Sequence, residues 1–310
     1  MTRVVQITAP APKVDEILAH VRGMEGVLEV QAQRGGSLQP RGDVLSLVVT
    51  NQAVFPLMSM LDRLGVTDST DMAVVITELR ALVSVAARGA VAEEHSEAMW
   101  EEMEAELAKG SNMAGNALVV MLVSGLLAGI GLGTGALHLV FAAMLIAPGF
   151  EPFMRIALGL VARSRSGWRG LRAAAKGYIA VFIGAGLSTL LLKILAIGPF
   201  SGAEAYLPVR GLVNYWTSIS ATALVVAALG AVAGTLLVAA NRAVLTGGVM
   251  VALSLIPSIT IAGMALAAGD WDLLLDGLWR WALEVLMVTA FSVATLWWKR
   301  VNIQRRDMHA

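Results

Sequence analysis

From residue 113 onward the chain is dominated by apolar stretches, each long enough to cross a lipid bilayer. The hydrocarbon core of a bilayer is about 30 Å thick and takes roughly 20 helical residues to cross. The predicted spans cover residues 113–132, 136–162, 177–197, 216–240, 243–268 and 273–298. The sequence therefore predicts an all-α polytopic membrane domain of about six helices and excludes a single water-soluble globule.

The charges divide the chain into two unequal parts. Residues 1–110 contain 16 acidic and 9 basic side chains, whereas residues 111–310 contain 7 acidic and 14 basic ones. This asymmetry indicates a polar N-terminal domain joined to a membrane domain. The expected boundaries are 1–79 for a cytosolic domain, 80–110 for an acidic connecting helix, 111–300 for the membrane domain and 301–310 for a cytosolic tail.

The N-terminal domain shows alternating strand and helix patterns. Strands are predicted at residues 3–8, 27–33, 44–50 and 72–78, and helices at residues 13–22 and 52–64. Gly35-Gly36 is expected to turn the chain, and Pro56 is expected to break or start the second helix. The order βαββαβ predicts an α+β, ferredoxin-like domain.

The stretch 79–109 is helix-forming and rich in glutamate. Trp100, Met103 and Leu107 lie on one stripe of this predicted helix. We interpret the stretch either as a solvated connecting helix or as a docked or self-associating face. Together with the small-residue faces of the spans, it leads us to expect a homo-oligomer.

Basic residues between the spans indicate the orientation. They are Arg163, Arg165, Arg169, Arg172 and Lys176 after the second span, Arg242 after the fourth, and Lys299, Arg300, Arg305 and Arg306 after the sixth. Six spans place all three basic segments on one side, together with the N-terminal domain. Because cytosolic segments carry an excess of Lys and Arg, and no signal-peptide pattern is present, we expect a multi-pass protein of the cell (inner or plasma) membrane with both termini cytosolic.

The second and fifth spans resemble each other. One contains Met144-Leu-Ile-Ala-Pro148 and the other contains Leu253-Ser-Leu-Ile-Pro257, at the same place in a three-span unit. Two copies of an odd number of spans enter the membrane in opposite directions, so the sequence predicts an inverted 3+3 repeat. Interrupted helices at matching positions of two halves are typical of a transport site. Two ordinary proline kinks without a ligand are the alternative.

Charged side chains accompany the first interruption. Glu151 lies between Pro148 and Pro152, and Arg155 follows one turn later. A charge inside a bilayer costs roughly 3 kcal/mol on insertion scales and usually marks function. We interpret Glu151 as a proton or cation site and Arg155 as its counter-charge or as an anion ligand. The alternative is a structural ion pair that locks the helix break.

Glu284 is the second candidate carboxylate. Asp276, Arg280 and Glu284 lie on one helical stripe, so Arg280 can pair with either acid. Asp276 is expected near the outer boundary of the membrane. Ser258, directly after Pro257, is a candidate hydroxyl ligand, although such hydroxyls more commonly bond their own helix.

The chain contains no cysteine, which excludes disulfides, thiolate metal sites and cysteine nucleophiles. It also lacks the Walker A, HExxH and GxSxG patterns. We therefore expect no enzyme activity, no cofactor, no metal and no nucleic-acid partner. The expected partners are the lipid bilayer and a small ion or solute.

The repeated motifs resemble a known family. Residues 143–148 (Ala-Met-Leu-Ile-Ala-Pro), residues 156–160 (Ile-Ala-Leu-Gly-Leu), the basic segment after them and residues 252–257 (Ala-Leu-Ser-Leu-Ile-Pro) are similar to a prokaryotic membrane family catalogued as domain of unknown function 389. The resemblance covers about residues 110–300. It implies the membrane fold, often with a small α/β domain ahead of it, and implies no established activity. Glu151, Ser258 and Glu284 depart from the family's pattern, so the resemblance lends the charged site no support.

Two functions are consistent with these features. The first is a transporter or channel for a small ion or solute, in which broken helices at Pro148 and Pro257 form a midplane site and the cytosolic domain regulates it. The second is a membrane-anchored sensor or scaffold whose α/β domain binds a small ligand or a partner. Polar residues at both interruptions favour transport, because an anchor does not need them.

Overall fold

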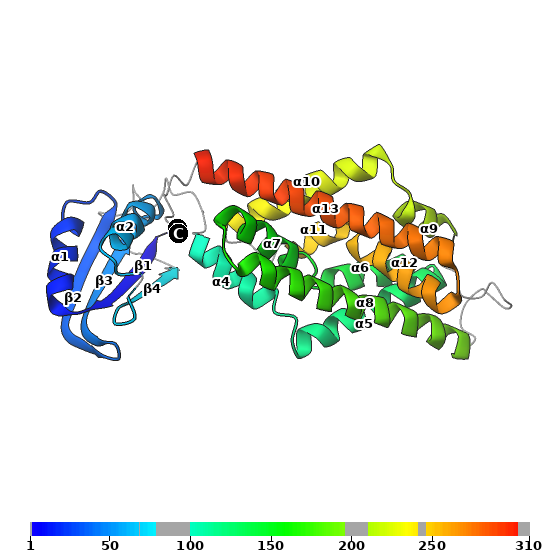
Figure 1. The fold of residues 1–310 in the computed structure, drawn as a ribbon, viewed down its shortest axis with the longest axis horizontal. Helices are drawn as coiled ribbons and strands as arrows, with labels where there is room; N and C mark the ends of the chain where they lie inside the picture. The colour runs from blue at the N-terminus through cyan, green and yellow to red at the C-terminus, as the bar shows by residue number, and fades with distance from the viewer. Residues whose placement is uncertain (1, 68, 79–99, 196–209, 241–245, 303–310) are drawn as a thin grey trace. The chain divides into compact units, whose positions relative to one another are not determined.

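The computed structural model of the chain describes residues 2–67, 69–78, 100–195, 210–240 and 246–302 (Figure 1). The chain divides into two compact units, Met1–Met99 with Gln304–Ala310, and Trp100–Ile303. The first unit is a mixture of strands and helices, and the second is helical.

The first unit contains a four-stranded antiparallel sheet and two helices. Its elements are β1 (Arg3–Ala9), α1 (Ala11–Val21), β2 (Val27–Leu38), β3 (Arg41–Val49), α2 (Asn51–Arg63) and β4 (Ala73–Glu78). The strand order is β2-β3-β1-β4, and all neighbours are antiparallel. The predicted alternation of strands and helices is confirmed.

The core of this unit lies on one face of the sheet. Val5, Ile7 and Ala9 alternate along β1 and are fully buried on that face. Ile17 of α1 and Leu57 of α2 belong to the same buried cluster. The two-residue period of the strands and the 3.6-residue period of the helices thus bring their apolar side chains to one interface.

The predicted turn at Gly35-Gly36 is wrong. β2 continues through both glycines with a register shift between Gln33 and Ser37, and the chain reverses only after Leu38. Gly35 has a φ of +62°, a conformation that glycine adopts without a steric penalty. The pair therefore forms an irregularity within an exposed strand at the edge of the sheet.

The predicted break or start at Pro56 is also wrong, because α2 is continuous from Asn51 to Arg63. Proline removes one backbone donor, which leaves the carbonyl of Gln52 without its helical partner. Gln52 and Pro56 both lie on the exposed face of α2. Water can therefore satisfy that carbonyl, and the helix continues.

Charges hold the irregular end of β2. Arg34 contacts Asp43 at 2.6 Å and Asp15 at 2.5 Å, and the amide of Gly35 donates to Asp43 at 2.7 Å. The Gly35 amide and then Arg34 lower the pKa of Asp43 below its ordinary value. The contribution of Asp43 to stability is therefore present above about pH 4 and is lost as the pH falls through the lowered pKa.

The second unit consists of helices. They are α4 (Trp100–Gly110), α5 (Asn116–Thr134), α6 (Leu137–Ile146), α7 (Glu151–Ala162), α8 (Ser166–Leu195), α9 (Arg210–Thr217), α10 (Ala221–Ala239), α11 (Thr246–Ala252), α12 (Leu255–Ala268) and α13 (Trp271–Asn302). Figure 1 shows α5, α8, α12 and α13 running beside one another, in agreement with their packing contacts.

Several of these helices can cross a membrane. Within the described residues, α5, α8, α10 and α13 are long and apolar enough to do so alone. The pairs α6–α7 and α11–α12 are bent by 42° and 54° and pass the same test together, which gives between four and six spans. Large apolar side chains such as Ile179, Leu229 and Leu286 are exposed on their outer faces, as lipid contact requires. The second unit is that of a multi-pass membrane protein.

Glycines allow α5 and α8 to pack in close contact. A Cβ at Gly125 would collide with the carbonyl of Val181, and one at Gly184 would collide with the carbonyl of Leu122. Small residues four apart, such as Gly125 and Gly129, permit this approach of two backbones. This glycine face of α5 therefore packs against α8 of the same chain.

The apolar stripe of α4 is buried within the second unit. Trp100, Met103 and Leu107 are each at most 5% exposed, and α4 packs against α7. This part of the predicted connecting helix is thus docked on its own chain rather than solvated. Residues 79–99 of that predicted helix, like Arg242, Arg305 and Arg306, lie outside the described residues.

Candidate functional site

The first helix break comprises residues 147–150, between α6 and α7. Pro148 lies in the break, and Pro152 lies in the first turn of α7, where a missing amide donor costs no helical hydrogen bond. The carbonyl of Gly149 accepts a hydrogen bond from the hydroxyl of Tyr178 in α8, at 3.2 Å. The following long helix thus satisfies a backbone group that the break has freed, as an apolar environment requires.

The second helix break comprises residues 253–254, between α11 and α12. Pro257 lies in the first turn of α12, just after the break rather than in it. The backbone amide of Ser254 donates to Glu284 Oε1 of α13 at 2.7 Å. As at the first break, a side chain of the following long helix satisfies a backbone group at the interruption.

Glu284 and Arg280 form a buried ion pair on α13. Each is 1% exposed, and Arg280 Nη1 lies 2.5 Å from Glu284 Oε2. Arg280 Nη2 also donates to Ser254 Oγ at 3.1 Å. Of the two acids on the stripe, Arg280 therefore pairs with Glu284, while Asp276 is exposed. The ion pair and Ser254 clamp the second break.

Glu151 joins the first break to the second broken pair. It is the first residue of α7, and Thr246, the first residue of α11, donates to its Oε1 at 3.3 Å. Its other oxygen, Oε2, is buried and accepts no hydrogen bond from any of the residues that the structure describes. Glu151 therefore has one carboxylate oxygen to which a proton or a cation can bind.

Arg155 lies one turn from Glu151 but is not brought to it. Its Nε donates to Ser166 Oγ and its Nη1 to Ser111 Oγ, both at 3.1 Å. In the described part of the chain, its hydrogen bonds go to these two hydroxyls and not to Glu151. These serines, at the start of α8 and just after α4, draw the guanidinium away from the break. A locking ion pair between Glu151 and Arg155 is therefore not formed.

Ser258 connects α12 to α9. It is fully buried, and its hydroxyl donates to the carbonyl of Trp216 at 3.0 Å. This is a bond between two helices, not the bond within its own helix that such hydroxyls more commonly make. In this conformation Ser258 positions α12 beside α9.

Both breaks lie over the same face of α10. A Cβ at Gly230 would contact Leu253 of the second break, and one at Gly234 would collide with the ring of Phe150 in the first. Residues four apart lie about one turn from each other on a helix. The two interruptions, which are far apart in the sequence, are therefore neighbours in the fold.

Tyr178 of α8 connects the first break to α13. Its hydroxyl donates to the carbonyl of Gly149 in the first break, and its ring contacts that of Trp281 on α13 with centroids 5.3 Å apart. Neither aromatic residue was predicted from the sequence. In the sequence, Tyr178 is marked only as a hydroxyl-bearing residue within a long apolar stretch. No spacing pattern links it to Glu151 or to Glu284.

Side chains fill the space between the breaks. Phe150, Met250 and Leu253 are at most 2% exposed. Within the described residues, no group of three His, Asp or Glu side chains is arranged to hold a metal ion. The chemistry of this region is thus that of two carboxylates, one clamped and one with an open oxygen, among packed apolar side chains.

The comparisons with known proteins concern this same region. Residues 144–290 match the model of a family described as Domain of unknown function (DUF389). The match begins in α6 and ends in α13, so it contains both breaks and both acidic residues. It confirms the resemblance inferred from the repeated motifs. No curated protein and no solved structure matches the chain.

Proposed function

We propose that this chain, whose residues 144–290 match DUF389, is a membrane transporter or channel for a small ion or solute, with its site between the two broken helix pairs. The observation that carries the proposal is the hydrogen bond from Thr246 of α11 to Glu151 of α7. It joins the second broken pair to an acidic side chain at the first. Ionisable residues within spans mark ion pathways, and paired helix breaks are typical of transporter sites.

The arrangement of the helices supports an inverted 3+3 repeat. One triplet is α5, the bent pair α6–α7 and the long helix α8, and the other is α10, the bent pair α11–α12 and the long helix α13. In each triplet the bent pair comes second and the third helix satisfies the break. If each bent pair is one span, the two triplets enter the membrane in opposite directions.

The helix geometry supports a site near the membrane midplane. At a rise of 1.5 Å per residue, Glu151 lies about 16 Å before Ala162 at the end of α7. This distance is close to half of the roughly 30 Å hydrocarbon thickness.

Contacts at the two ends of the bundle support the proposed orientation. Arg300 donates to the carbonyl of Val161, so the basic end of α13 lies beside the end of α7, which precedes the basic segment 163–176. Lys193 of α8 donates to the carbonyl of Ala267 at 3.4 Å, at the ends of α8 and α12. One end therefore carries most of the bases, and we assign it to the cytosol of a cell membrane.

We assign the first unit as a cytosolic regulatory domain of ferredoxin-like fold. The element order βαββαβ and the strand order β2-β3-β1-β4 support that fold.

A homo-oligomer stays a prediction, which light scattering of the purified protein in detergent would test. Absence of enzyme activity and of a cofactor also stay predictions.

The packing of the breaks suggests that this conformation is closed. Phe150, Met250 and Leu253 are buried and fill the space between the two breaks, while Glu151 itself is partly exposed. We infer that an ion can pass from one break to the other only if α7 moves relative to α11. Because the chain has no native cysteine, single cysteines at residues 145–156 can be tested for labelling by water-soluble reagents. Labelling that appears only under an imposed ion gradient would support the motion, and labelling at no position under any gradient would contradict it.

The central experiment measures flux with the purified full-length protein in liposomes. Proton, Na⁺ and K⁺ gradients are imposed, and ion-sensitive dyes in the lumen report movement. We expect flux above that of empty liposomes and a loss of at least about tenfold in Glu151→Gln, because the amide cannot carry a negative charge. Asp272→Asn is the matched control, since Asp272 is an exposed acid in the first turn of α13.

The outcomes separate the two functions. Absence of flux from correctly folded protein under every gradient would remove the transport proposal and leave the membrane-anchored sensor or scaffold. Flux that is equal in Glu151→Gln and in the unmodified protein would keep transport but discard the role of Glu151.

A further inference from the structure

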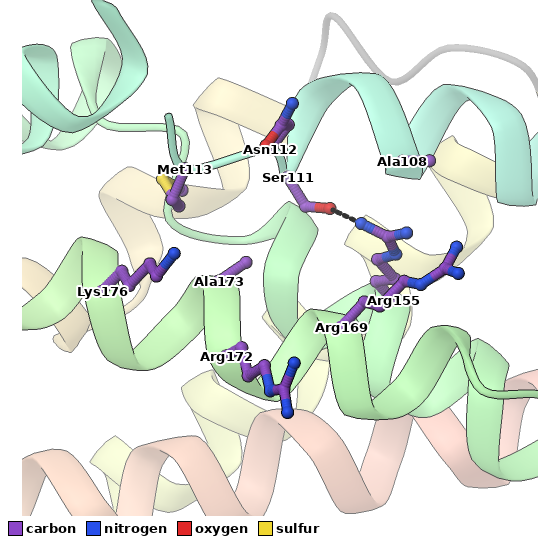
Figure 2. A pocket seen from close by; sticks show the side chains of 9 residues that line it. All are labelled: Ala108, Ser111, Asn112, Met113, Arg155, Arg169, Arg172, Ala173 and Lys176. Carbon is purple, nitrogen blue, oxygen red and sulfur yellow. Dashed lines mark hydrogen bonds between the residues drawn. The ribbon is translucent and has the colours of Figure 1, made fainter. Parts of the chain in front are cut away.

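A second polar feature of the helical unit lies beside the first helix break, at the end of α4. It is a cavity of about 310 Å³ between the end of α4, the segment 111–113, α7 and α8. Its polar lining consists of Ser111, Asn112, Arg155, Arg169, Arg172 and Lys176 (Figure 2). Four of the described lining residues are cationic and none is acidic. We call this cavity the basic pocket.

Arg155 is the innermost cation of the basic pocket. It is only 8% exposed, and Figure 2 shows Ser111 pointing toward its guanidinium. Its hydrogen bonds go to the neutral hydroxyls of Ser111 and Ser166. Glu104 acts on it electrostatically but does not line the pocket. Because a buried charge is costly without an opposite charge, a guanidinium held in this way favours the binding of an anion.

The other three cations project from one face of α8. Arg169, Arg172 and Lys176 are spaced i, i+3 and i+7, which places them along one side of the helix. All three are exposed, so they line the mouth of the pocket while Arg155 lines its base. The Arg172 guanidinium also lies 5.2 Å from the centre of the Trp168 ring, a cation–π contact that restricts its side chain.

The positive-inside rule explains only part of this arrangement. That rule concerns bases in segments near the ends of spans, and it accounts for exposed residues such as Arg163 and Arg165. It does not require a buried arginine that bonds to two serines, nor a concave surface around it. The buried Arg155 and the cavity are therefore a second observation, independent of the local excess of positive charge.

We propose that the basic pocket binds a phosphate group. Arginines donate two parallel hydrogen bonds to phosphate oxygens, and lysine adds a point charge. The hydroxyl of Ser111 and the amide of Asn112 supply further donors. Inorganic phosphate and the headgroup of an anionic phospholipid share this chemistry, and the cavity volume falls within the range of small-molecule sites. The proposal does not depend on transport.

The position of the pocket gives phosphate binding a structural consequence. Ser111 follows α4 and leads to α5, and Arg155 lies on α7 one turn after Glu151. A bound phosphate would therefore connect the end of α4 to the helix that begins at the first break. It would stabilise the packing of α4 on α7.

The test uses the full-length protein purified in detergent and, separately, in nanodiscs. Thermal unfolding is measured against inorganic phosphate, with chloride at equal ionic strength as the reference. Lipid retention is measured by native mass spectrometry after exchange into mixtures of phosphatidylcholine and phosphatidylglycerol. Arg172→Gln with Lys176→Gln removes two exposed cations of the pocket, and Arg163→Gln with Arg165→Gln removes two exposed cations of the same segment outside it.

We expect the pocket pair to weaken binding at least about tenfold and the control pair to change it by less than about twofold, where tenfold corresponds to about 1.4 kcal/mol. Arg155→Lys, which keeps the charge but loses the two-pronged geometry, should also weaken binding. Stabilisation by inorganic phosphate identifies a soluble anion, and retention of phosphatidylglycerol without a phosphate effect identifies the headgroup. Equal losses in both pairs, or no response to either probe, would overturn the proposal.

Discussion

The two helix breaks each hold one acidic residue, but the two carboxylates have different surroundings. Glu284 is 1% exposed, forms an ion pair with Arg280 at 2.5 Å and accepts the Ser254 amide at 2.7 Å. Glu151 accepts a longer hydrogen bond, of 3.3 Å, from Thr246, and among the described residues its second oxygen has no partner. A carboxylate held by a counter-charge and an amide is fixed in place, whereas a weakly held one is free to bind or release a proton or a cation. We infer that the second break is the rigid side of the site and the first is the responsive side.

The largest expected effect comes from separating the ion pair of the second break. Arg280→Met or Glu284→Met leaves one buried charge without its partner, which costs about 3–5 kcal/mol in comparable buried pairs. The double substitution leaves no buried charge and should lose less stability than either single one. The measurement is the free energy of unfolding in a denaturing-detergent titration, with the exposed Asp276→Asn on the same helix as the control. If the double variant loses the sum of the two single losses, the residues do not act as a pair.

The next effect concerns the packing of the first break. In Gly149→Ala, the new Cβ would lie 2.7 Å from the Tyr178 hydroxyl and 2.8 Å from Met250 Cε. Overpacking of this kind costs about 1–3 kcal/mol. Gly248→Ala on α11 is the control, because nothing lies within 4 Å of that position; it should be neutral or stabilise by up to about 1 kcal/mol. Equal unfolding temperatures for the two variants would show that the first break is not tightly packed.

A smaller effect is expected from the hydrogen bond that satisfies the first break. Tyr178→Phe removes the donor to the Gly149 carbonyl and leaves that carbonyl buried, at a cost of about 1–2 kcal/mol. Tyr215→Phe is the matched control, because Tyr215 is 71% exposed. Thermal unfolding of both variants in the same detergent measures the difference. A loss that is no greater than that of Tyr215→Phe would mean that water satisfies the carbonyl.

The spans and the existence of the breaks could be predicted from the sequence because a bilayer imposes them. Backbone groups in lipid must be hydrogen-bonded internally, so long apolar runs form helices and prolines mark interruptions. The exact point of interruption was less predictable. Proline fits the first turn of a helix, and Pro257 therefore follows the second break, while Pro148 lies within the first.

The pairing of polar side chains was not predictable from spacing alone. Arg155 and Arg280 each follow or precede an acid by four residues, and the sequence allowed both pairs. Of the two arginines, Arg280 forms its pair, and it also donates to Ser254 of the second break. Arg155 instead meets Ser111, which is 44 residues away in the chain. Tertiary contacts of this kind leave no local pattern in a single sequence.

The sharpest test of the difference between the breaks applies one substitution to both acids. Glu284→Gln removes the negative charge that Arg280 needs, so it should lose several kcal/mol of stability, as a broken buried pair does. Glu151→Gln keeps an oxygen that can accept the Thr246 hydroxyl and strands no cation, so its free energy of unfolding should change by less than about 1 kcal/mol. The same titration in denaturing detergent measures both variants. For Glu151→Gln we therefore expect a lower flux with a nearly unchanged free energy of unfolding. For Glu284→Gln we expect both the flux and the free energy of unfolding to fall. An equal loss of stability at both positions would mean that Glu151 is as much a structural clamp as Glu284, and the distinction between a rigid and a responsive break would have to be abandoned.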